Sequence, residues 1–179
     1  MNIMLVGGGG REHAILRSLK KNPAVETVWM LPGNGGMADE AICTGISATD
    51  LDAIVAFAKE HPVDYAVVAP DDPLVLGCVD RLNELGIPCF GPKANAAIIE
   101  GSKAFSKDLM KKYSIPTAAY EIFTELDKAL EYLKTAPIPT VVKADGLALG
   151  KGVIIAMTRE EAVEAVTDMM AGGKFGKSG

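Results

Sequence analysis

The stretch NIMLVGGGGREHAIL, residues 2–16, decides the fold. Residues 2–6 form a short apolar run, which is typical of a strand covered on both faces of a parallel sheet. Four glycines at 7–10 follow this run directly and open a helical pattern over 11–21. A strand, a tight turn and a helix in this order begin a β-α-β unit, because parallel strands need a crossover connection. The stretch therefore predicts a parallel α/β sheet.

The same alternation continues outward to about residue 92. Further strands are predicted at 25–31, 65–69 and 87–90, and helices at 51–61 and 73–85, where apolar residues recur at helical spacing. Asp72 fits the N-cap of the last helix, Pro73 its first turn and Gly86 its C′ position. The pattern predicts an open, doubly wound, Rossmann-like parallel sheet as a first domain over 1–92.

Beyond residue 92 the pattern changes. Two helices at 94–100 and 102–113 predict a helical connector over 93–115. From 116 to 179 we expect an α+β region, with a strand near 118–123, a helix from Thr124, and strands at 140–144 and 153–157 around a glycine-rich loop. Thr158 and Glu161 form a capping-box pattern that starts a last helix. Residues 172–179 read as a loop, and we expect the second domain to be truncated there.

Composition limits the classes of function. The net charge is −5 and aromatic residues make up 6%, which disfavours nucleic-acid binding. Cys43, Cys78 and Cys89 show no C-x-x-C spacing, so a disulfide framework or zinc site is disfavoured, and Cys78 and Cys89 are predicted to be small buried hydrophobes. A secretory signal and the ~20-residue apolar run of a membrane helix are not found. We expect a soluble, cytoplasmic protein without a nucleic-acid or membrane partner.

The glycines at 7–10 predict a phosphate site. The first turn of a helix presents unpaired N–H groups and the positive end of the dipole, and glycines let an anion approach the backbone. The dinucleotide fingerprint G-x-G-x-x-G fails, since its third glycine position holds Glu12, and the ribose-binding acid expected roughly 20 residues later is absent, because the second strand ends in a turn at 31–36. NAD binding is therefore disfavoured, a mononucleotide-sized phosphate ligand is favoured, and a purely structural tight turn is the alternative.

Further polar candidates lie just after the glycines and after the second and third predicted strands. Arg11 could clamp a phosphate, and His13 could either contact a ligand or pack at the helix start. The turn at 32–34 follows the second strand, and Asp71 follows the third without an evident structural role. Asp71 is therefore a candidate for binding hydroxyl or amine groups of a ligand.

A second set of candidates surrounds the later glycine loop. Lys143 lies in an apolar strand, where an ammonium group is costly unless it meets an anion. The loop at 145–152 could fold over a polyphosphate, and residues 146–152 are expected to be mobile without nucleotide. It is not a P-loop, because Gly152 stands where that motif needs Ser or Thr. Lys103 lies at a predicted helix start, where a cation suggests either an anionic ligand or a solvated surface position.

Several of these motifs together resemble one family, the glycinamide ribonucleotide synthetases. The resemblance is carried, in order, by GGGGREH at 7–13, PGN at 32–34, FGP at 90–92, EGSKAFSK at 100–107 and KADGLALGKGV at 143–153. It spans essentially the whole chain. Departures occur at 69–74, where APDDPL replaces the usual Gly-Pro-Glu before Pro-Leu, and at Leu149, where a small residue is common.

The resemblance implies a pre-ATP-grasp domain followed by part of an ATP-grasp domain. It implies the ATP-dependent ligation of 5-phosphoribosylamine and glycine in purine biosynthesis, with Mg²⁺ or Mn²⁺, through glycyl phosphate, by a monomer or weak homodimer. The ATP-binding residues that it implies are Lys103, Lys143, Gly146, Gly150, Lys151 and Gly152. The substrate-binding residues that it implies are Gly8, Gly9, Gly10, Arg11, Glu12, His13, Gly33, Asn34 and Asp71.

The metal ligands of this family are not expected in the chain. ATP-grasp enzymes hold the metal on strand-borne carboxylates that include a Glu-x-Asn pattern, and no Glu-x-Asn occurs here. No catalytic residue is assigned, and the chain is expected not to catalyse ligation by itself. The alternatives are another ATP-grasp ligase or carboxylase, or a non-catalytic nucleotide-binding module.

Overall fold

The computed structural model describes residues 1–146 and 152–172. The chain divides into two compact units, Met1–Ile98 and Ile99–Gly179. Each unit has its own secondary structure and core, and each is described separately.

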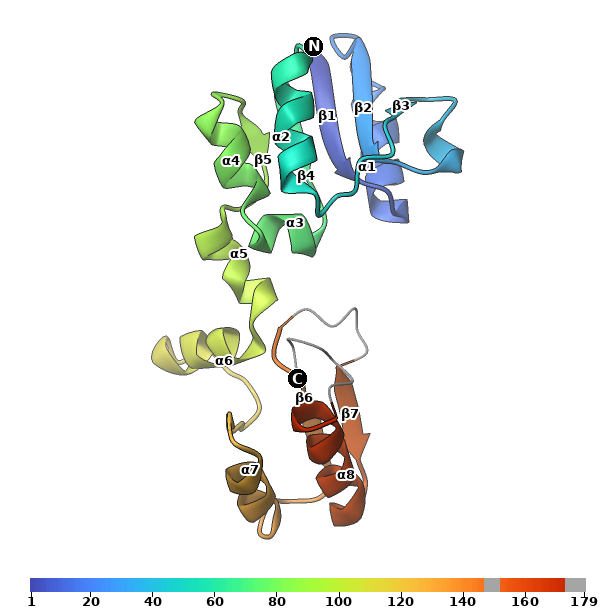
Figure 1. The fold of residues 1–179 in the computed structure, drawn as a ribbon. Helices are drawn as coiled ribbons and strands as arrows, with labels where there is room; N and C mark the ends of the chain where they lie inside the picture. Colours follow the sequence, from blue (N-terminus) through green and yellow to red (C-terminus); the bar gives the residue numbers. More distant parts are fainter. Residues whose placement is uncertain (147–151, 173–179) are drawn as a thin grey trace. The chain divides into compact units, whose positions relative to one another are not determined.

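The first unit is built on a parallel sheet of five strands in the order β3-β2-β1-β4-β5 (Figure 1). Its elements are β1 (Asn2–Gly7), α1 (Gly10–Leu19), β2 (Thr27–Pro32), the 3₁₀ helix η1 (Gly35–Met37), β3 (Ile42–Cys43), α2 (Leu51–Glu60), β4 (Tyr65–Val68), α3 (Asp71–Val75), α4 (Cys78–Glu84) and β5 (Cys89–Phe90). Every strand pair is parallel. The predicted open parallel sheet is confirmed.

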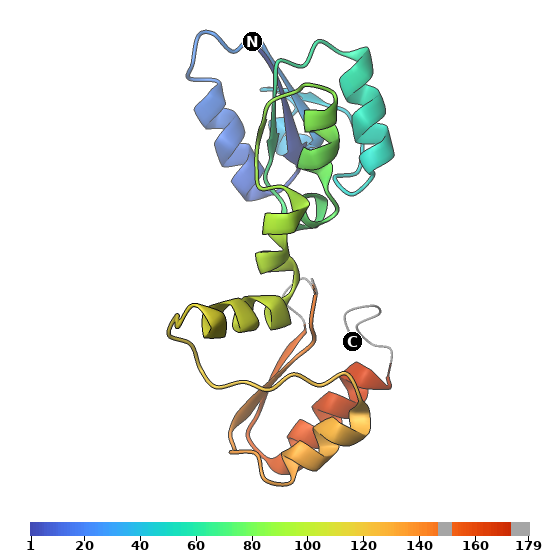
Figure 2. The ribbon, with the colours of Figure 1, turned by 90° about the vertical axis from the view of Figure 1, so that its left-hand side faces the viewer.

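Helices cover both faces of this sheet, as the second view shows (Figure 2). Met4 and Val6 of β1 pack with Ile54 of α2 and Leu82 of α4 on one face. The alternate residues of the strands form the other core, with α1 and η1: Ile3, Leu5, Leu16, Val28, Met30, Met37 and Val67. Because successive side chains of a strand point to opposite faces, one apolar run supplies both cores. The doubly wound arrangement is confirmed.

Two predictions in the first unit are wrong in detail. The helix predicted over 73–85 is two helices, because Gly77 takes a left-handed conformation with φ of +89° between α3 and α4. Asp72 is not an N-cap, because α3 begins at Asp71 and its N-cap is Pro70. Strand β3 was not predicted, since two residues are too short for an apolar pattern. Gly86 follows α4 with φ of +79°, as its predicted C′ position requires.

The second unit contains an antiparallel hairpin, β6 (Thr140–Lys143) and β7 (Val153–Ala156), packed against α7 (Leu126–Leu133) and α8 (Arg159–Met170). Helix α6 (Lys103–Lys112) precedes them, and α5 (Ala94–Gly101) spans the boundary of the units. The core of this unit is small and rich in alanine: Ala129, Leu133, Ala136, Ala156, Ala162 and Val166. The predicted hairpin and the capping box of Thr158 and Glu161 are both confirmed.

The strand predicted near 118–123 is wrong. These residues have no regular secondary structure, and Lys107 instead binds the Thr117 hydroxyl and the Ala118 carbonyl through its Nζ. A strand needs a pairing partner for its backbone, and the described part of this unit pairs β6 only with β7. Within the described ranges, no helix has the length and apolarity needed to cross a membrane.

Candidate functional site

The carboxyl ends of β1, β2 and β4 bring three predicted ligand-binding segments to one edge of the sheet. The glycines at 7–10 follow β1, Gly33 and Asn34 follow β2, and Asp71 follows β4. Strands β2 and β3 are added on one side of β1, and β4 and β5 are added on the other side, so the order of strand addition reverses between β1 and β4. Ligands of open α/β sheets bind at this switch point. The fold therefore places the candidates where a ligand site is expected.

The first two glycine-rich turns are bound to each other. The side chain of Asn34 donates from Nδ2 to the Gly8 carbonyl at 2.7 Å and accepts from the Gly36 N–H at 2.8 Å. A Cβ at Gly8 would lie 2.6 Å from the Gly33 carbonyl oxygen. A glycine at position 8 is therefore required by the contact between the turns. Asn34 holds this contact together, whatever else it binds.

The start of α1 leaves donors open to an anion. Gly9 is the N-cap, and its N–H donates to Glu12 Oε2 at 2.6 Å. This is half of a capping box, since glycine has no side chain to return a hydrogen bond. The N–H groups of Gly10 and Arg11 belong to the first turn, which has no partners inside the helix. Gly10 is exposed, and apart from its chain neighbours and the backbone of α1 no atom lies within 4 Å of a Cβ built there, so this side of the turn is accessible.

Charged side chains surround this turn. Arg11 Nη2 lies 4.0 Å from Asp71 Oδ1, and both side chains are exposed, so the segments that follow the paired strands β1 and β4 present opposite charges at the switch point. By contrast, Glu12 is 3% exposed and lies beneath the turn rather than on its surface.

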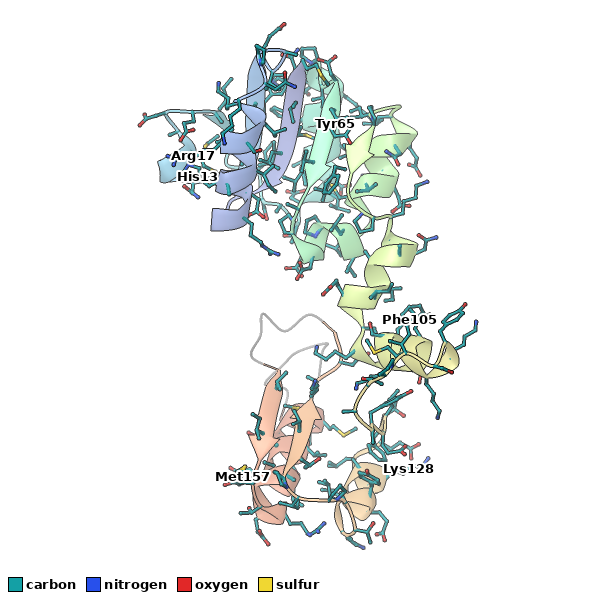
Figure 3. All side chains as sticks on the ribbon, turned by 180° about the vertical axis from the view of Figure 1, so that it is seen from behind. His13, Arg17, Tyr65, Phe105, Lys128 and Met157 are labelled. Atoms are coloured by element: carbon teal, nitrogen blue, oxygen red, sulfur yellow. The ribbon has the colours of Figure 1, made fainter. Side chains whose placement is uncertain are left out.

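His13 is held by an acidic residue that the sequence did not reveal. His13 and Arg17 both extend from α1 (Figure 3), and Glu40 Oε1 lies 3.4 Å from His13 Nε2 and accepts from Arg17 Nε at 3.1 Å. The hydrogen bonds from His13 and Arg17 lower the pKa of Glu40. Glu40 follows η1 in an irregular segment, so no periodic signal pointed to it. His13 therefore has a structural role, the contact with Glu40, and its role as a ligand contact stays a prediction.

A second cluster joins the start of α6 to the end of β6. Asp145 accepts hydrogen bonds from the Ser102 hydroxyl at 2.9 Å and the Ala104 N–H at 3.1 Å. Lys103 Nζ donates to the Gly146 carbonyl at 2.7 Å. The ammonium of Lys103 thus has a carbonyl partner inside the chain, and the Asp145 carboxylate accepts hydrogen bonds from the start of α6 itself.

Lys143 is exposed, contrary to the prediction that its ammonium group lies in an apolar environment. It is exposed on β6, together with Val141, because only the opposite face of the hairpin packs on α7 and α8. Its charge therefore needs no buried anion. Of the other predicted nucleotide-binding residues, Gly146 and Gly152 are described, whereas Gly150 and Lys151 lie outside the described residues, as does most of the loop expected to be mobile.

The cysteines differ in their surroundings. Cys78 and Cys89 are shielded, and burial raises their pKa values to about 12 and about 11. Cys43 is exposed at the end of β3, with Sγ 3.6 Å from the Asn34 carbonyl, which places a thiol beside the site. Among the described residues, no group of three or more His, Cys, Asp or Glu is arranged to hold a metal ion.

The fold is that of the ATP-grasp ligases. Residues 101–179 match the ATP-grasp (A) domain of phosphoribosylglycinamide synthetase. The biotin carboxylase domain of 2-oxoglutarate carboxylase from Hydrogenobacter thermophilus has a similar fold, with a TM-score of 0.76 and 21% identity over 99% of this chain and 42% of that one. Residues 1–100 match the N domain of phosphoribosylglycinamide synthetase, and the chain belongs to this family. The N-domain match decides against another ATP-grasp family.

Individual relatives agree with this assignment. The chain is 49% identical over 179 residues to phosphoribosylamine–glycine ligase of Halalkalibacterium halodurans and 51% identical over 181 residues to that of Vibrio vulnificus, covering 100% of this chain and 42% of each relative. The crystal structure of the Thermotoga maritima ligase has a TM-score of 0.80 and 32% identity over 99% of this chain and 41% of that one. The chain thus spans about two fifths of the length of these relatives.

Proposed function

We propose that the chain provides the sugar-phosphate domain and part of the nucleotide domain of an ATP-dependent phosphoribosylamine–glycine ligase of purine biosynthesis. In this reaction a carboxylate oxygen of glycine attacks the γ-phosphorus of ATP, which forms glycyl phosphate and releases ADP. The amine of 5-phosphoribosylamine then attacks the glycyl carbonyl. An amide bond forms, the C–O bond to phosphate breaks, and the nitrogen loses a proton. The products are glycinamide ribonucleotide, ADP and phosphate.

The observation that carries the proposal is the convergence of three strand-end segments at the switch point of the sheet. The 5-phosphate is assigned to the Gly8–Gly10 turn and Arg11, where backbone N–H groups and a guanidinium favour an anion. The turn at Gly33 and Asn34 forms the neighbouring wall, with His13 beside it, and Asp71 is assigned to a hydroxyl or the amine of the ribose. Family membership supports this assignment.

The nucleotide is assigned to the second unit. Lys103, Lys143 and the glycine-rich segment from 146 to 152 are the proposed contacts of the ATP phosphates. Lys103 Nζ now donates to the Gly146 carbonyl. When ATP binds, the same ammonium group would donate to a phosphate oxygen instead. The described residues do not form a site that fits Mg²⁺ or Mn²⁺, so no step is assigned to a metal held by them. The proposed partners are small molecules, and the proposed assembly is a monomer or weak homodimer.

Calorimetric titration of the chain with ribose 5-phosphate, which keeps the phosphate and lacks the reactive amine, tests the sugar-phosphate site. Arg11→Ala should weaken binding about tenfold, as expected for loss of a charge-assisted phosphate contact. Arg81→Ala is the matched control, because Arg81 of α4 pairs with Asp52 of α2 in the same unit, away from the strand ends that form the site. The proposal is contradicted if the wild-type chain does not bind, or if both variants weaken binding equally.

A further inference from the structure

Among the described residues, Glu12 is the only charged residue that is buried. It is 3% exposed, Oε2 accepts the Gly9 N–H, and Oε1 is buried without a hydrogen-bond partner. A carboxylate with one unsatisfied buried oxygen is costly, so stability alone does not explain it. A buried polar atom without a partner needs an explanation, and a functional role of the contact between Glu12 and the Gly9 N–H would provide one.

Its side chain fills the gap between two strand ends. A Cβ built at Gly7 would lie 2.4 Å from Glu12 Cγ and 3.0 Å from Pro70 Cγ. Gly7 ends β1 and Pro70 follows β4, so the Glu12 side chain lies at the switch point, directly under the glycine turn. Gly7 has no Cβ because the Glu12 side chain occupies that space, and its φ of +127° also requires glycine.

The contact fixes the direction of the turn. The Gly9 N–H points inward to the carboxylate, so it is not available to a ligand, and the chain then enters α1 with the next two N–H groups unpaired. The side chain of Glu12 itself is closed off by the turn above it. Glu12 therefore shapes the turn from below, whereas Gly10 and Arg11 line its accessible side.

We propose that Glu12 is a positioning residue: its buried carboxylate holds the Gly9 N–H so that the N–H groups of Gly10 and Arg11 face an incoming phosphate monoester, and Glu12 does not touch the ligand. This rests on the sugar-phosphate site proposed above. The resemblance alone had placed Glu12 among the substrate contacts, and the burial of its side chain assigns it a different role.

A matched control is available in the same chain. Glu161 makes the corresponding contact at the exposed start of α8, where its Oε2 accepts the N–H of the N-cap Thr158 at 3.3 Å and that of Met157 at 2.7 Å. Glu12→Ala and Glu161→Ala each remove one helix-capping carboxylate. Glu12→Gln keeps an amide carbonyl that can accept the Gly9 N–H and places an NH₂ group at the unsatisfied oxygen.

The experiment measures ribose 5-phosphate affinity, thermal midpoint and hydrogen exchange of the Gly9 amide in the 179-residue chain. Glu12→Ala should bind about tenfold more weakly and lose Gly9 protection, whereas Glu12→Gln should stay within roughly threefold of wild type and Glu161→Ala within roughly twofold. Should Glu12→Ala fail to fold, Glu12→Gln decides on its own. Rescue by glutamine supports positioning, and a loss of affinity with Gly9 still protected overturns it, because the charge would then contact the ligand.

The two proposals can fail separately. If the wild-type chain does not bind ribose 5-phosphate, the proposed function fails, and exchange of the Gly9 amide still tests the contact: unchanged protection in Glu12→Ala overturns the positioning role. If the wild type binds and folded Glu12→Ala binds equally well, only the positioning role is overturned.

Discussion

At the scale of single residues, Cys43 offers a direct reporter of the site. It is exposed and lies beside Asn34, whereas burial raises the pKa of Cys78 to about 12 and that of Cys89 to about 11. At pH 8 a small alkylating reagent should therefore modify Cys43 first, because the thiolate is the reactive species. Ribose 5-phosphate should slow this reaction. Peptide mapping by mass spectrometry measures both effects, and equal rates at Cys43 and Cys78 would contradict the described surroundings.

A second residue-scale prediction uses two glycines of the same turn. Gly8→Ala should destabilise the first unit by about 1–3 kcal/mol, because its Cβ would lie 2.6 Å from the Gly33 carbonyl oxygen, and overpacking is costly. Gly10→Ala should be neutral or stabilise by about 0.4–1 kcal/mol, since its Cβ meets nothing within 4 Å at the start of a helix. Chemical denaturation of both variants provides the comparison. Equal losses would mean that the two turns do not touch as described.

At the scale of elements, Asp145 connects the start of α6 to the hairpin. Burial alone would raise the pKa of Asp145, but hydrogen bonds from the Ala104 N–H, the Ser102 hydroxyl and the N–H groups of Lys103 and Gly146 lower it below the ordinary 3.8. A carboxyl with a lowered folded-state pKa stabilises the fold above its unfolded pKa, and the contribution is lost as pH falls through the folded pKa.

The stability difference between wild type and Asp145→Ala should therefore be constant above about pH 5 and shrink below pH 4. Loss of such a cap typically costs about 0.5–2 kcal/mol at neutral pH. Thermal melts at a series of pH values measure the difference, with Asp127→Ala as a control on the exposed first turn of α7. A difference that grows on acidification would contradict the assigned hydrogen bonds.

The elements also show what the sequence could predict. The long apolar and amphipathic runs of β1, α1 and α2 and the capping box of α8 were correctly predicted because local periodicity and capping decide them. The residues at 118–123 resemble a strand locally but lack a partner, and Gly77 breaks the helix with a left-handed backbone that a glycine permits but does not require. Strand pairing is non-local, so no local pattern could have excluded the strand.

The candidate site was predictable to a similar degree. The glycine turns, Arg11 and Asp71 follow strands, and the rule that parallel strands end at one edge brings them together. Glu40 and Cys43 reach the site from irregular segments or a two-residue strand, where sequence spacing gives no position. The burial of Glu12 and the exposure of Lys143 depend on which face of each element is covered, and that is a property of the packed structure.

At the scale of the whole molecule, the two units have cores of unequal size. The first unit packs large side chains on both faces of its sheet, whereas the second unit is centred on alanines. Because hydrophobic stabilisation scales with the apolar area buried, the second unit should unfold first. The single tryptophan, Trp29, lies in the first unit and reports on it alone.

Thermal unfolding should therefore show two transitions by far-UV circular dichroism, and Trp29 fluorescence should follow only the higher one. Leu133→Ala, in the core of the second unit, should lower the first transition and leave the fluorescence midpoint unchanged. Coincident transitions by both probes would show that the units unfold as one cooperative body, contrary to this prediction.

The central claim is that the carboxyl edge of the first sheet binds the phosphate of a ribose phosphate at the start of α1. Its most direct test is an amide chemical-shift titration of the ¹⁵N-labelled chain with ribose 5-phosphate. We expect the largest shifts at Gly10 and Arg11, smaller ones at Asn34 and Asp71, and none of comparable size in α7 or α8. Saturable shifts confined to the second unit, or no saturable shifts at all, would contradict it.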